Sequence, residues 1–524
     1  MRSIRVPLIG VAVAVATASG SALALPLPLS APAVAAPAAD GAPDPGSTRS
    51  LPLAPLPGHE RSADPGTRAA QGLPRRDVEP FSLLGVVWDE PDAELHGTVQ
   101  VRTRSTATGA WSSWQDLETH QGDHAADPGT AEARSRAVRG GTAPLWVGES
   151  DGVEVRVRPG APDGRGAAPA LPRGLRVDLV HPGGDPAGGA APAAPGAAPQ
   201  DDPDVEEPAE EDGETGTGED TGTGEDTGTG EDTGTGEDTG AGEDTGTGEP
   251  ADEDTGTADP AEDESPFEPD DPGEDASDVL TAEESAASAV NADLAPLGAT
   301  EIPELSKAET EESLPDTTAA KPYIGPRPRI VTRKGWGADE KLREPNFLYT
   351  KSVQVAFVHH SATGNNYTCA QAPSVLRGIY RYHVQSMGWR DLGYNFAVDK
   401  CGTVYEGRAG GVAKPVQGAH TLGFNTNTTG VAVLGSFSSA TPPAKAVTAV
   451  AKLTAWKLGL HAKDPRARST LTSGGGNRYK KGTKVPFVNV SGHRDGYATA
   501  CPGAKLYGKL GTVRSAAAKY QGRP

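Results

Sequence analysis

Aromatic residues, cysteines and, over one long stretch, basic residues are scarce in this chain of 524 residues. Aromatic residues make up only 5% of the sequence, which contains 67 Gly and 47 Pro. A large part of the chain is therefore not expected to pack into a core. Beyond the N-terminus no stretch is long and apolar enough to span a membrane. The length still allows two or three domains.

Basic residues are absent from one acidic region. Residues 201–280 contain 33 Asp and Glu and no Lys or Arg. The centre of this region repeats Thr-Gly-Thr-Gly-Glu-Asp with a period of six. Acidic nonapeptide repeats can bind calcium as stacked turns, but this shorter repeat has no apolar position that could pack. We therefore expect residues 183–318 to form a disordered, extended and self-repelling acidic linker.

The N-terminus has the layout of a secretory signal peptide. Arg2 and Arg5 precede an apolar run over residues 8–25, and small residues follow up to Ala36. The alternative is a membrane anchor, but Gly and Pro interrupt the run, which is short for a span of about 20 residues. We predict a signal peptide at residues 1–36, an exported protein without a transmembrane segment after cleavage, and disorder over residues 37–78.

Short runs of alternating polarity predict a small all-β sandwich of unknown role over residues 79–182. The expected strands lie at residues 81–88, 98–104, 111–117, 144–147, 153–158 and 175–180. Four tryptophans fall in this domain, namely Trp88, Trp111, Trp114 and Trp146. They either fill the core or form a platform on which sugars stack.

Residues 319–524 predict one α/β domain with a central mixed β-sheet flanked by helices. The apolar run at 353–358 is typical of a buried central strand, and residues 394–398 and 403–406 flank a hairpin turn. Residues 375–383 place apolar side chains on one helical face, and a second helix is expected over residues 441–458. The chain is therefore expected to be multidomain.

The C-terminal part is strongly basic. Residues 325–524 contain 29 Lys and Arg against 8 Asp and Glu, a net charge of +21. Such a field attracts anionic polymers, and both nucleic acid and bacterial cell wall qualify. An exported protein meets cell wall first, so we expect no nucleic-acid partner.

The cysteines number three, which is an odd count for an exported protein. One disulfide and one functional thiolate would account for them, and an exported chain favours a disulfide between Cys369 and Cys401 over two free thiols.

His359 ends the apolar strand, and His493 precedes Cys501 by eight positions on a loop. Two imidazoles and a thiolate make a three-ligand zinc set with a fourth position open for water. A closed structural site would need a fourth protein ligand, and no further cysteine is spare.

Six ordered blocks carry a resemblance to a known family. They are residues 333–338, 358–362, 388–396, 398–408, 418–421 with Asn425, and 492–503. Together they resemble the peptidoglycan recognition protein family, which shares its fold with phage-type, zinc-dependent N-acetylmuramoyl-L-alanine amidases. The resemblance covers about residues 327–515 and does not extend to the β domain or the acidic linker.

The resemblance implies a zinc ion held by His359, His493 and Cys501. Because successive side chains of a strand point to opposite faces, His359 is expected to face the metal and His360 to face away. Tyr394 matches the family's tyrosine beside the metal-bound water. Binding-only members usually lack the cysteine ligand, so Cys501 indicates the hydrolytic branch.

Other positions are expected to contact or surround the substrate. Thr499 matches the family position two residues before the cysteine, where it would stabilise an oxyanion and count as catalytic. The expected substrate-binding residues are Trp389, Arg408, His420, Thr421 and Asn425, of which His420 is the best candidate because it lies in a Gly-rich loop. His383 is expected to pack under the site. Beside the ligands there is no obvious carboxylate base; Glu406 is a weak candidate that is otherwise structural.

The resemblance therefore implies hydrolysis of the amide bond between N-acetylmuramic acid and L-alanine, with Zn²⁺ as cofactor and bacterial peptidoglycan as partner. We expect an extracellular, cell-wall-associated monomer. The main alternative is a peptidoglycan-binding receptor or inhibitor without catalysis. A zinc peptidase that cuts within the stem peptide is a third possibility, which the ligand set alone does not exclude.

Overall fold

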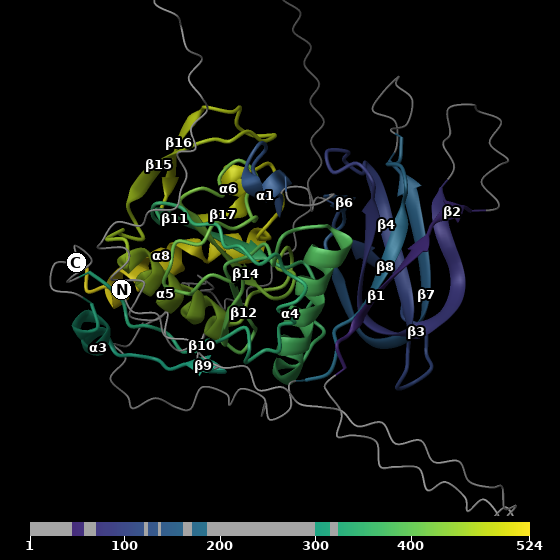
Figure 1. Cartoon of the computed structure of the whole chain (residues 1–524), viewed down its shortest axis with the longest axis horizontal. Coiled ribbons are helices and arrows are strands. Elements are labelled where there is room, and N and C mark those ends of the chain that lie inside the picture. The colour runs from purple at the N-terminus through teal and green to yellow at the C-terminus, as the bar shows by residue number, and fades with distance from the viewer. Residues whose placement is uncertain are drawn as a thin grey trace, which may run out of the picture. The chain divides into compact units, whose positions relative to one another are not determined.

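The computed structural model describes residues 44–56, 70–119, 124–134, 138–160, 170–185, 299–314 and 323–524 (Figure 1). All of these residues belong to one compact unit, Pro43–Pro524. The signal peptide predicted at residues 1–36 and the acidic repeats lie outside the described residues. Within the described ranges, no helix combines the length and the apolar character that a membrane crossing requires.

The N-terminal domain is built on an antiparallel sheet with the strand order β1-β8-β3-β7-β4-β5, in which β2 and β6 also pair with β3. Its long central strand β3 pairs with β7 and β8, so the expected sandwich is one continuous hydrogen-bonded sheet. Polar and apolar residues alternate as expected, and Val99, Val101 and Thr103 of β4 are buried. The strands are β1 (Ser47–Pro52), β2 (Ala54–Pro55), β3 (Gln71–Trp88), β4 (Gly97–Ser105), β5 (Gln115–Leu117), β6 (Gly140–Gly141), β7 (Leu145–Pro159) and β8 (Arg176–His181), and the short helix α1 (Ala131–Arg134) lies between β5 and β6.

Two segments expected to be disordered contain regular structure, which corrects the predicted boundaries. Residues 37–78 include β1, β2 and the start of β3, because Leu51 and Leu53 are buried in the core of the sheet. The prolines and charges around these two leucines concealed the strand in the sequence. Residues 183–318 include strand β9 (Glu301–Ile302) and helix α3 (Lys307–Glu312). Strand β9 pairs with the C-terminal sheet, so that domain begins before residue 319.

The tryptophans of the N-terminal domain form two pairs. Trp88 and Trp146 are 2% and 6% exposed and belong to hydrophobic clusters. Trp111 and Trp114 are half-buried, and the guanidinium of Arg156 lies 3.8 Å from the ring centroid of Trp114. Core packing therefore explains the presence of Trp88 and Trp146. In the second pair, the guanidinium of Arg156 stacks on Trp114 and covers part of its ring.

The C-terminal domain has the expected mixed sheet, with the strand order β17-β11-β14-β12-β13-β10-β9. Strand β11 runs parallel to both β14 and β17, and β12 forms the expected antiparallel hairpin with β13. The strands are β10 (Ile330–Val331), β11 (Val355–His360), β12 (Phe396–Val398), β13 (Val404–Glu406), β14 (Thr428–Val433) and β17 (Val490–Gly492), with a separate hairpin of β15 (Arg468–Thr472) and β16 (Lys484–Val488).

Helices cover both faces of this sheet. On β12, Phe396 and Val398 pack in the cluster that contains α5 and α8, whereas Ala397 packs in the cluster of α4. Helix α5 begins at Ala444, three residues later than expected. The helices are η2 (Cys369–Gln371), α4 (Ala372–Arg381), the π-helix η3 (Tyr382–Ser386), α5 (Ala444–Gly459), α6 (His493–Gly496), α7 (Ala504–Gly508) and α8 (Leu510–Tyr520).

The two domains share a hydrophobic cluster. Trp146 and Val180 of the N-terminal sheet pack in the same cluster as Val375 and Ile379 of α4. Tyr382 donates a hydrogen bond from its hydroxyl to the carbonyl of Thr142, at 3.0 Å. Apolar burial and matched polar groups are what a specific interface requires.

Candidate metal centre

The parallel strands β11 and β17 place two histidines side by side. Val358 of β11 is in register with Gly492 of β17, and the next residues are His359 and His493. Their ring centroids are 4.5 Å apart, and both side chains are fully buried. The histidines therefore meet at the edge of the sheet where these parallel strands end.

Cys501 reaches the same point from the loop before α7. Its Sγ lies 3.8 Å from Nδ1 of His359, and the residue is 2% exposed. His360 faces the other way, where its Nδ1 accepts a hydrogen bond from the amide of Phe437 at 3.3 Å and its Nε2 lies 3.2 Å from a carboxylate oxygen of Glu118. The structure thus brings together the three residues expected to be ligands and separates His360 from them.

A fourth donor, His124, was not expected. Potential ligand atoms of His124, His359, His493 and Cys501, which we call the four-donor cluster, all lie within 4.8 Å of one another. Nε2 of His124 is 4.0 Å from Sγ of Cys501, and its ring centroid is 4.5 Å from that of His493. The sequence contains no local signal for this residue, because His124 belongs to the other domain and reaches the site only through tertiary packing.

The donor set fits zinc. In a tetrahedral site, the bond lengths of Zn–N and Zn–S place nitrogen and sulfur ligands about 3.6 Å apart. The observed sulfur-to-nitrogen distances of 3.8 and 4.0 Å are close to that value. Burial, followed by the neighbouring rings of His493 and His124, holds the pKa of His359 well below its usual range. His359 is therefore neutral, which is the form that donates a lone pair to a metal.

Tyr394 borders the four-donor cluster. It is 2% exposed, and its ring centroid is 5.5 Å from that of His359 and 5.6 Å from that of His124. His383 lies behind it, with Nδ1 accepting from the amide of Gly393 at 3.2 Å and its ring 4.3 Å from that of Trp389. His383 therefore packs under the site as expected, and Trp389, 4% exposed, covers it.

His420 differs from its expected place in the groove. The ring is fully buried, with Nδ1 3.0 Å from the hydroxyl of Thr421 and Nε2 3.4 Å from that of Thr428. A Cβ at Gly430 would lie 2.5 Å from this ring, so the glycine makes room for it. Its centroid is 5.2 Å from that of His359. His420 therefore packs against a candidate ligand, and its role in substrate binding stays a prediction.

Thr421 and Asn425 are fully buried as well, and they organise the same loop. Oδ1 of Asn425 accepts hydrogen bonds from the amides of His420 and Thr421, at 2.7 and 3.0 Å. Thr499 lies next to Cys501 and accepts a hydrogen bond from its amide at 3.2 Å. Thr499 thus helps to position Cys501, whereas the substrate-binding roles of Thr421 and Asn425 stay predictions.

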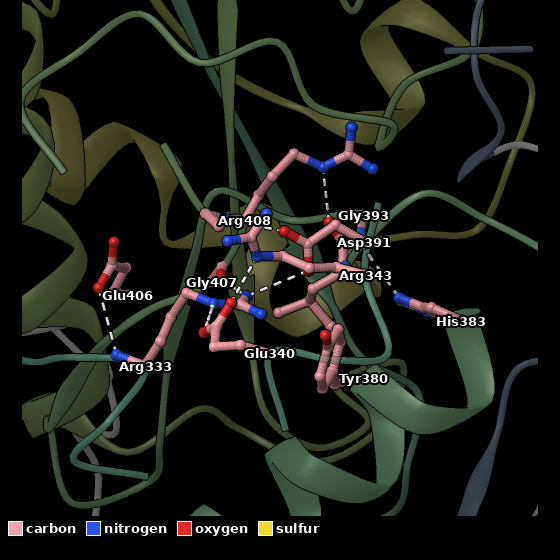
Figure 2. A network of polar contacts seen from close by, with 12 residues as sticks. Arg333, Glu340, Arg343, Tyr380, His383, Asp391, Gly393, Glu406, Gly407 and Arg408 are labelled. Carbon is pink, nitrogen blue, oxygen red and sulfur yellow. Dashed lines mark hydrogen bonds and ion pairs between the residues drawn. The ribbon is translucent and has the colours of Figure 1, made fainter. Parts of the chain in front are cut away.

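Glu406 ends strand β13, Arg408 follows two residues later, and both belong to a buried polar network (Figure 2). Arg408 donates from Nε to the carbonyl of Leu392 at 2.7 Å and lies in a pocket together with Arg390. Glu406 instead turns toward Arg333 and accepts a hydrogen bond from its amide at 3.2 Å. Burial raises the pKa of Glu406, but the side chain serves the network and does not point to the donors. The structural interpretation of Glu406 is therefore favoured over a role as base.

Cys369 and Cys401 form the expected disulfide, with their Cα atoms 6.2 Å apart. It connects the start of η2 to the turn between β12 and β13. Cys501 is not part of this disulfide, and it is buried.

Comparison with known proteins identifies the family to which the C-terminal domain belongs. Residues 349–504 match the family described as N-acetylmuramoyl-L-alanine amidase, and residues 35–200 match the one described as Rv3811 N-terminal galactose-binding domain-like. Peptidoglycan-recognition protein SC2 of Drosophila melanogaster is 30% identical over 186 residues, which cover 35% of this chain and 85% of that protein. The N-acetylmuramoyl-L-alanine amidase of Homo sapiens is 32% identical over 201 residues, 38% of this chain and 30% of that protein. Among solved structures, wild-type Drosophila PGRP-LB is 24% identical, with coverage of 35% of this chain and 93% of that one and a TM-score of 0.28. Through its C-terminal domain the chain belongs to the peptidoglycan recognition protein and N-acetylmuramoyl-L-alanine amidase family.

Proposed function

We propose that this protein is a zinc-dependent amidase that hydrolyses the bond between N-acetylmuramic acid and L-alanine in bacterial peptidoglycan. The observation that carries the proposal is the convergence of His359, His493 and Cys501 in one buried cluster, with Tyr394 beside it. A protein that only binds cell wall has no need of a buried thiol between two imidazoles. The presence of Cys501 therefore favours hydrolysis over a receptor.

The three residues would hold the metal, and His420 would keep His359 in position. When bound, zinc supplies a water of lowered pKa and polarises the scissile carbonyl. Tyr394 would hydrogen-bond the attacking water or the developing oxyanion, a role that its position beside His359 supports. The hydroxyl of Thr499 accepts from the Cys501 amide, which leaves its own proton to be donated to an oxyanion.

Substrate would approach along the polar groove that contains Arg408. The guanidiniums of Arg390 and Arg408 line one pocket, and such groups favour carboxylates and other anions. The net charge of +21 over residues 325–524 would draw the domain to anionic cell wall. This substrate places the working protein outside the cell, at the wall, where the predicted signal peptide would send it.

A digestion with end-group analysis tests the proposal. Purified peptidoglycan is incubated with the full chain and zinc, and with the His124→Ala protein, because His124 lies close enough to the other three donors to compete with water for the metal. An amidase exposes one new L-alanine amino group per cut and no new reducing sugar end. New amino groups on another amino acid would indicate a peptidase, and wall binding without any cut by either protein would indicate a receptor. The Cys501→Ser protein should bind wall and release no amino groups.

A further inference from the structure

Residues 124–134, which we call the plug segment, belong to the N-terminal domain but bury three polar side chains against the C-terminal domain. His124, Asp127 and Glu132 are 4%, 5% and 4% exposed. Burial of a carboxylate or an imidazole is costly unless the receiving surface supplies partners. Each of the three side chains meets such partners, and each does so at a different part of the candidate active site.

His124 reaches the four-donor cluster. Its Nε2 lies 4.0 Å from Sγ of Cys501, and its ring centroid is 5.2 Å from that of His359. A zinc ion held by three protein ligands keeps a position for water, whereas four protein ligands close the coordination sphere. A metal held by all four donors of the cluster, His124 included, would therefore keep no position for water.

Asp127 fastens the segment to the loop behind the donors. Its Oδ1 accepts hydrogen bonds from the amide of Gly423 and from Nδ2 of Asn425, both at 2.7 Å, and its Oδ2 accepts from the amide of Asn425 at 3.3 Å. Nδ2 of Asn425 also donates to the carbonyl of Ala125 at 3.0 Å. The same Asn425 side chain holds the amide of His420, so the segment is built into the structure that supports the site.

The carboxylate of Glu132 contacts the two arginines of the pocket, Arg408 and Arg390. Its Oε1 accepts a hydrogen bond from Arg408 at 2.8 Å, and its Oε2 lies 3.4 Å from Nε of Arg390. An anionic group of a substrate must compete with this carboxylate for both guanidiniums. The segment therefore blocks the groove and the donors together.

The interface between the domains holds the segment in place. Trp146 packs in the cluster of α4, and its amide donates to the carbonyl of Thr363 at 3.1 Å. A tethered group has a high effective concentration at its target. His124 can therefore displace a water ligand without strong intrinsic affinity.

We propose that the plug segment is a built-in inhibitor in which His124 is a fourth metal ligand, and that the enzyme cuts peptidoglycan only when the segment leaves the site. The inhibitory consequence rests on the proposed amidase function, whereas the ligand assignment does not.

Cobalt(II) spectroscopy of the full chain tests the ligand assignment without reference to activity. Cobalt in place of zinc absorbs visible light according to its coordination, and a site with an open position changes its spectrum when azide binds. We expect the wild-type spectrum to be insensitive to azide and the His124→Ala spectrum to shift. Loss of zinc to a chelator should be about tenfold faster in His124→Ala, since even outer-shell partners of a metal affect affinity by 10–100-fold. His96→Ala, which removes an exposed histidine of the same domain, should match the wild type.

A hydrolysis assay tests the inhibition. If fewer than a tenth of the molecules are open, His124→Ala should cut peptidoglycan about tenfold faster than wild type. Glu132→Gln keeps all four donors and weakens only the arginine contacts, so it should increase azide sensitivity and hydrolysis to a smaller extent. If His124→Ala does not fold, Glu132→Gln tests the inhibition by itself, and unchanged azide sensitivity and hydrolysis in this variant would contradict the proposal.

Azide shifts of equal size in wild type and His124→Ala, together with equal rates of zinc loss, would overturn the proposal. Equal hydrolysis by the two proteins would show that the segment does not inhibit. Absence of hydrolysis in every variant would contradict the amidase function, and the cobalt spectra would still decide whether His124 is a ligand.

Discussion

Nε2 of His124 lies 4.0 Å from Sγ of Cys501, although the two residues are 377 positions apart in the sequence. The contact joins a domain of the galactose-binding-like class to the site of an amidase-family domain. Two consequences follow. The candidate metal centre contains one more donor than the amidase domain alone supplies, and the N-terminal domain contributes that donor.

Cys501→Ser should weaken zinc binding and abolish hydrolysis. A serine hydroxyl is a poor zinc ligand at neutral pH, because zinc prefers thiolate, imidazole and carboxylate donors. Zinc content after dialysis, measured by elemental analysis, is the readout. Circular dichroism serves as the control for folding, and full zinc content with normal hydrolysis would contradict the ligand assignment.

Tyr394→Phe should keep zinc and lose rate. The ring packs against His359 and His383, and phenylalanine preserves those contacts. Removal of one hydrogen-bond donor to a developing charge typically costs about a hundredfold in kcat. Steady-state kinetics in the His124→Ala background measure the effect. A change in KM alone would assign Tyr394 to substrate binding.

Thr499→Ala should also lower kcat, whereas Thr499→Ser should retain most of it. Serine keeps the hydroxyl that accepts from the Cys501 amide, and alanine removes it. Comparison of kcat and zinc content for the two variants separates catalysis from positioning. If Thr499→Ala loses zinc, the residue acts by orienting Cys501.

Glu406→Gln should hydrolyse peptidoglycan at the wild-type rate. Glutamine can still accept the hydrogen bond from the amide of Arg333, which is the contact that the carboxylate makes. A neutral side chain at this position therefore leaves the donors undisturbed. A loss of a hundredfold or more with zinc retained would make Glu406 the missing general base.

Replacement of both Cys369 and Cys401 by serine should lower stability and leave the chemistry intact. The disulfide closes a loop with a sequence separation of 32, for which chain entropy predicts a loss of about 3–4 kcal/mol. Urea denaturation of the double variant, compared with reduced and oxidised wild type, measures the loss. An unchanged unfolding midpoint would show that the bond does not constrain the unfolded chain.

The three donors of the C-terminal domain were expected largely through the resemblance to a known family. Alternation along a strand separated His359 from His360, whereas the segment from His493 to Cys501, expected to be a loop, begins with the short helix α6. The mixed sheet and the disulfide also agree with expectation. These features depend on local geometry or on residues inside one fold, which periodicity and motif order express directly.

The contacts between domains could not be predicted in the same way. His124 lies in a segment without periodicity, and this segment is bonded to the other domain through Asp127, which accepts from Gly423 and Asn425. The Gly-rich loop around His420 favours substrate contact in the sequence, whereas the structure adds that Gly430 leaves room for a buried ring, which no local pattern indicates. Strand β1 was missed because prolines and charges surround Leu51 and Leu53.

The central claim is that this protein cuts the bond between N-acetylmuramic acid and L-alanine, and mass spectrometry of the products tests it most directly. Purified peptidoglycan is digested with the full-length His124→Ala protein loaded with zinc, beside wild type and Cys501→Ser. We predict uncut glycan chains whose N-acetylmuramic acid residues carry a free lactyl carboxylate, together with peptides that begin with L-alanine, and neither product with Cys501→Ser. Peptides that begin at a later stem residue, or walls left whole by the zinc-loaded proteins, would contradict the account.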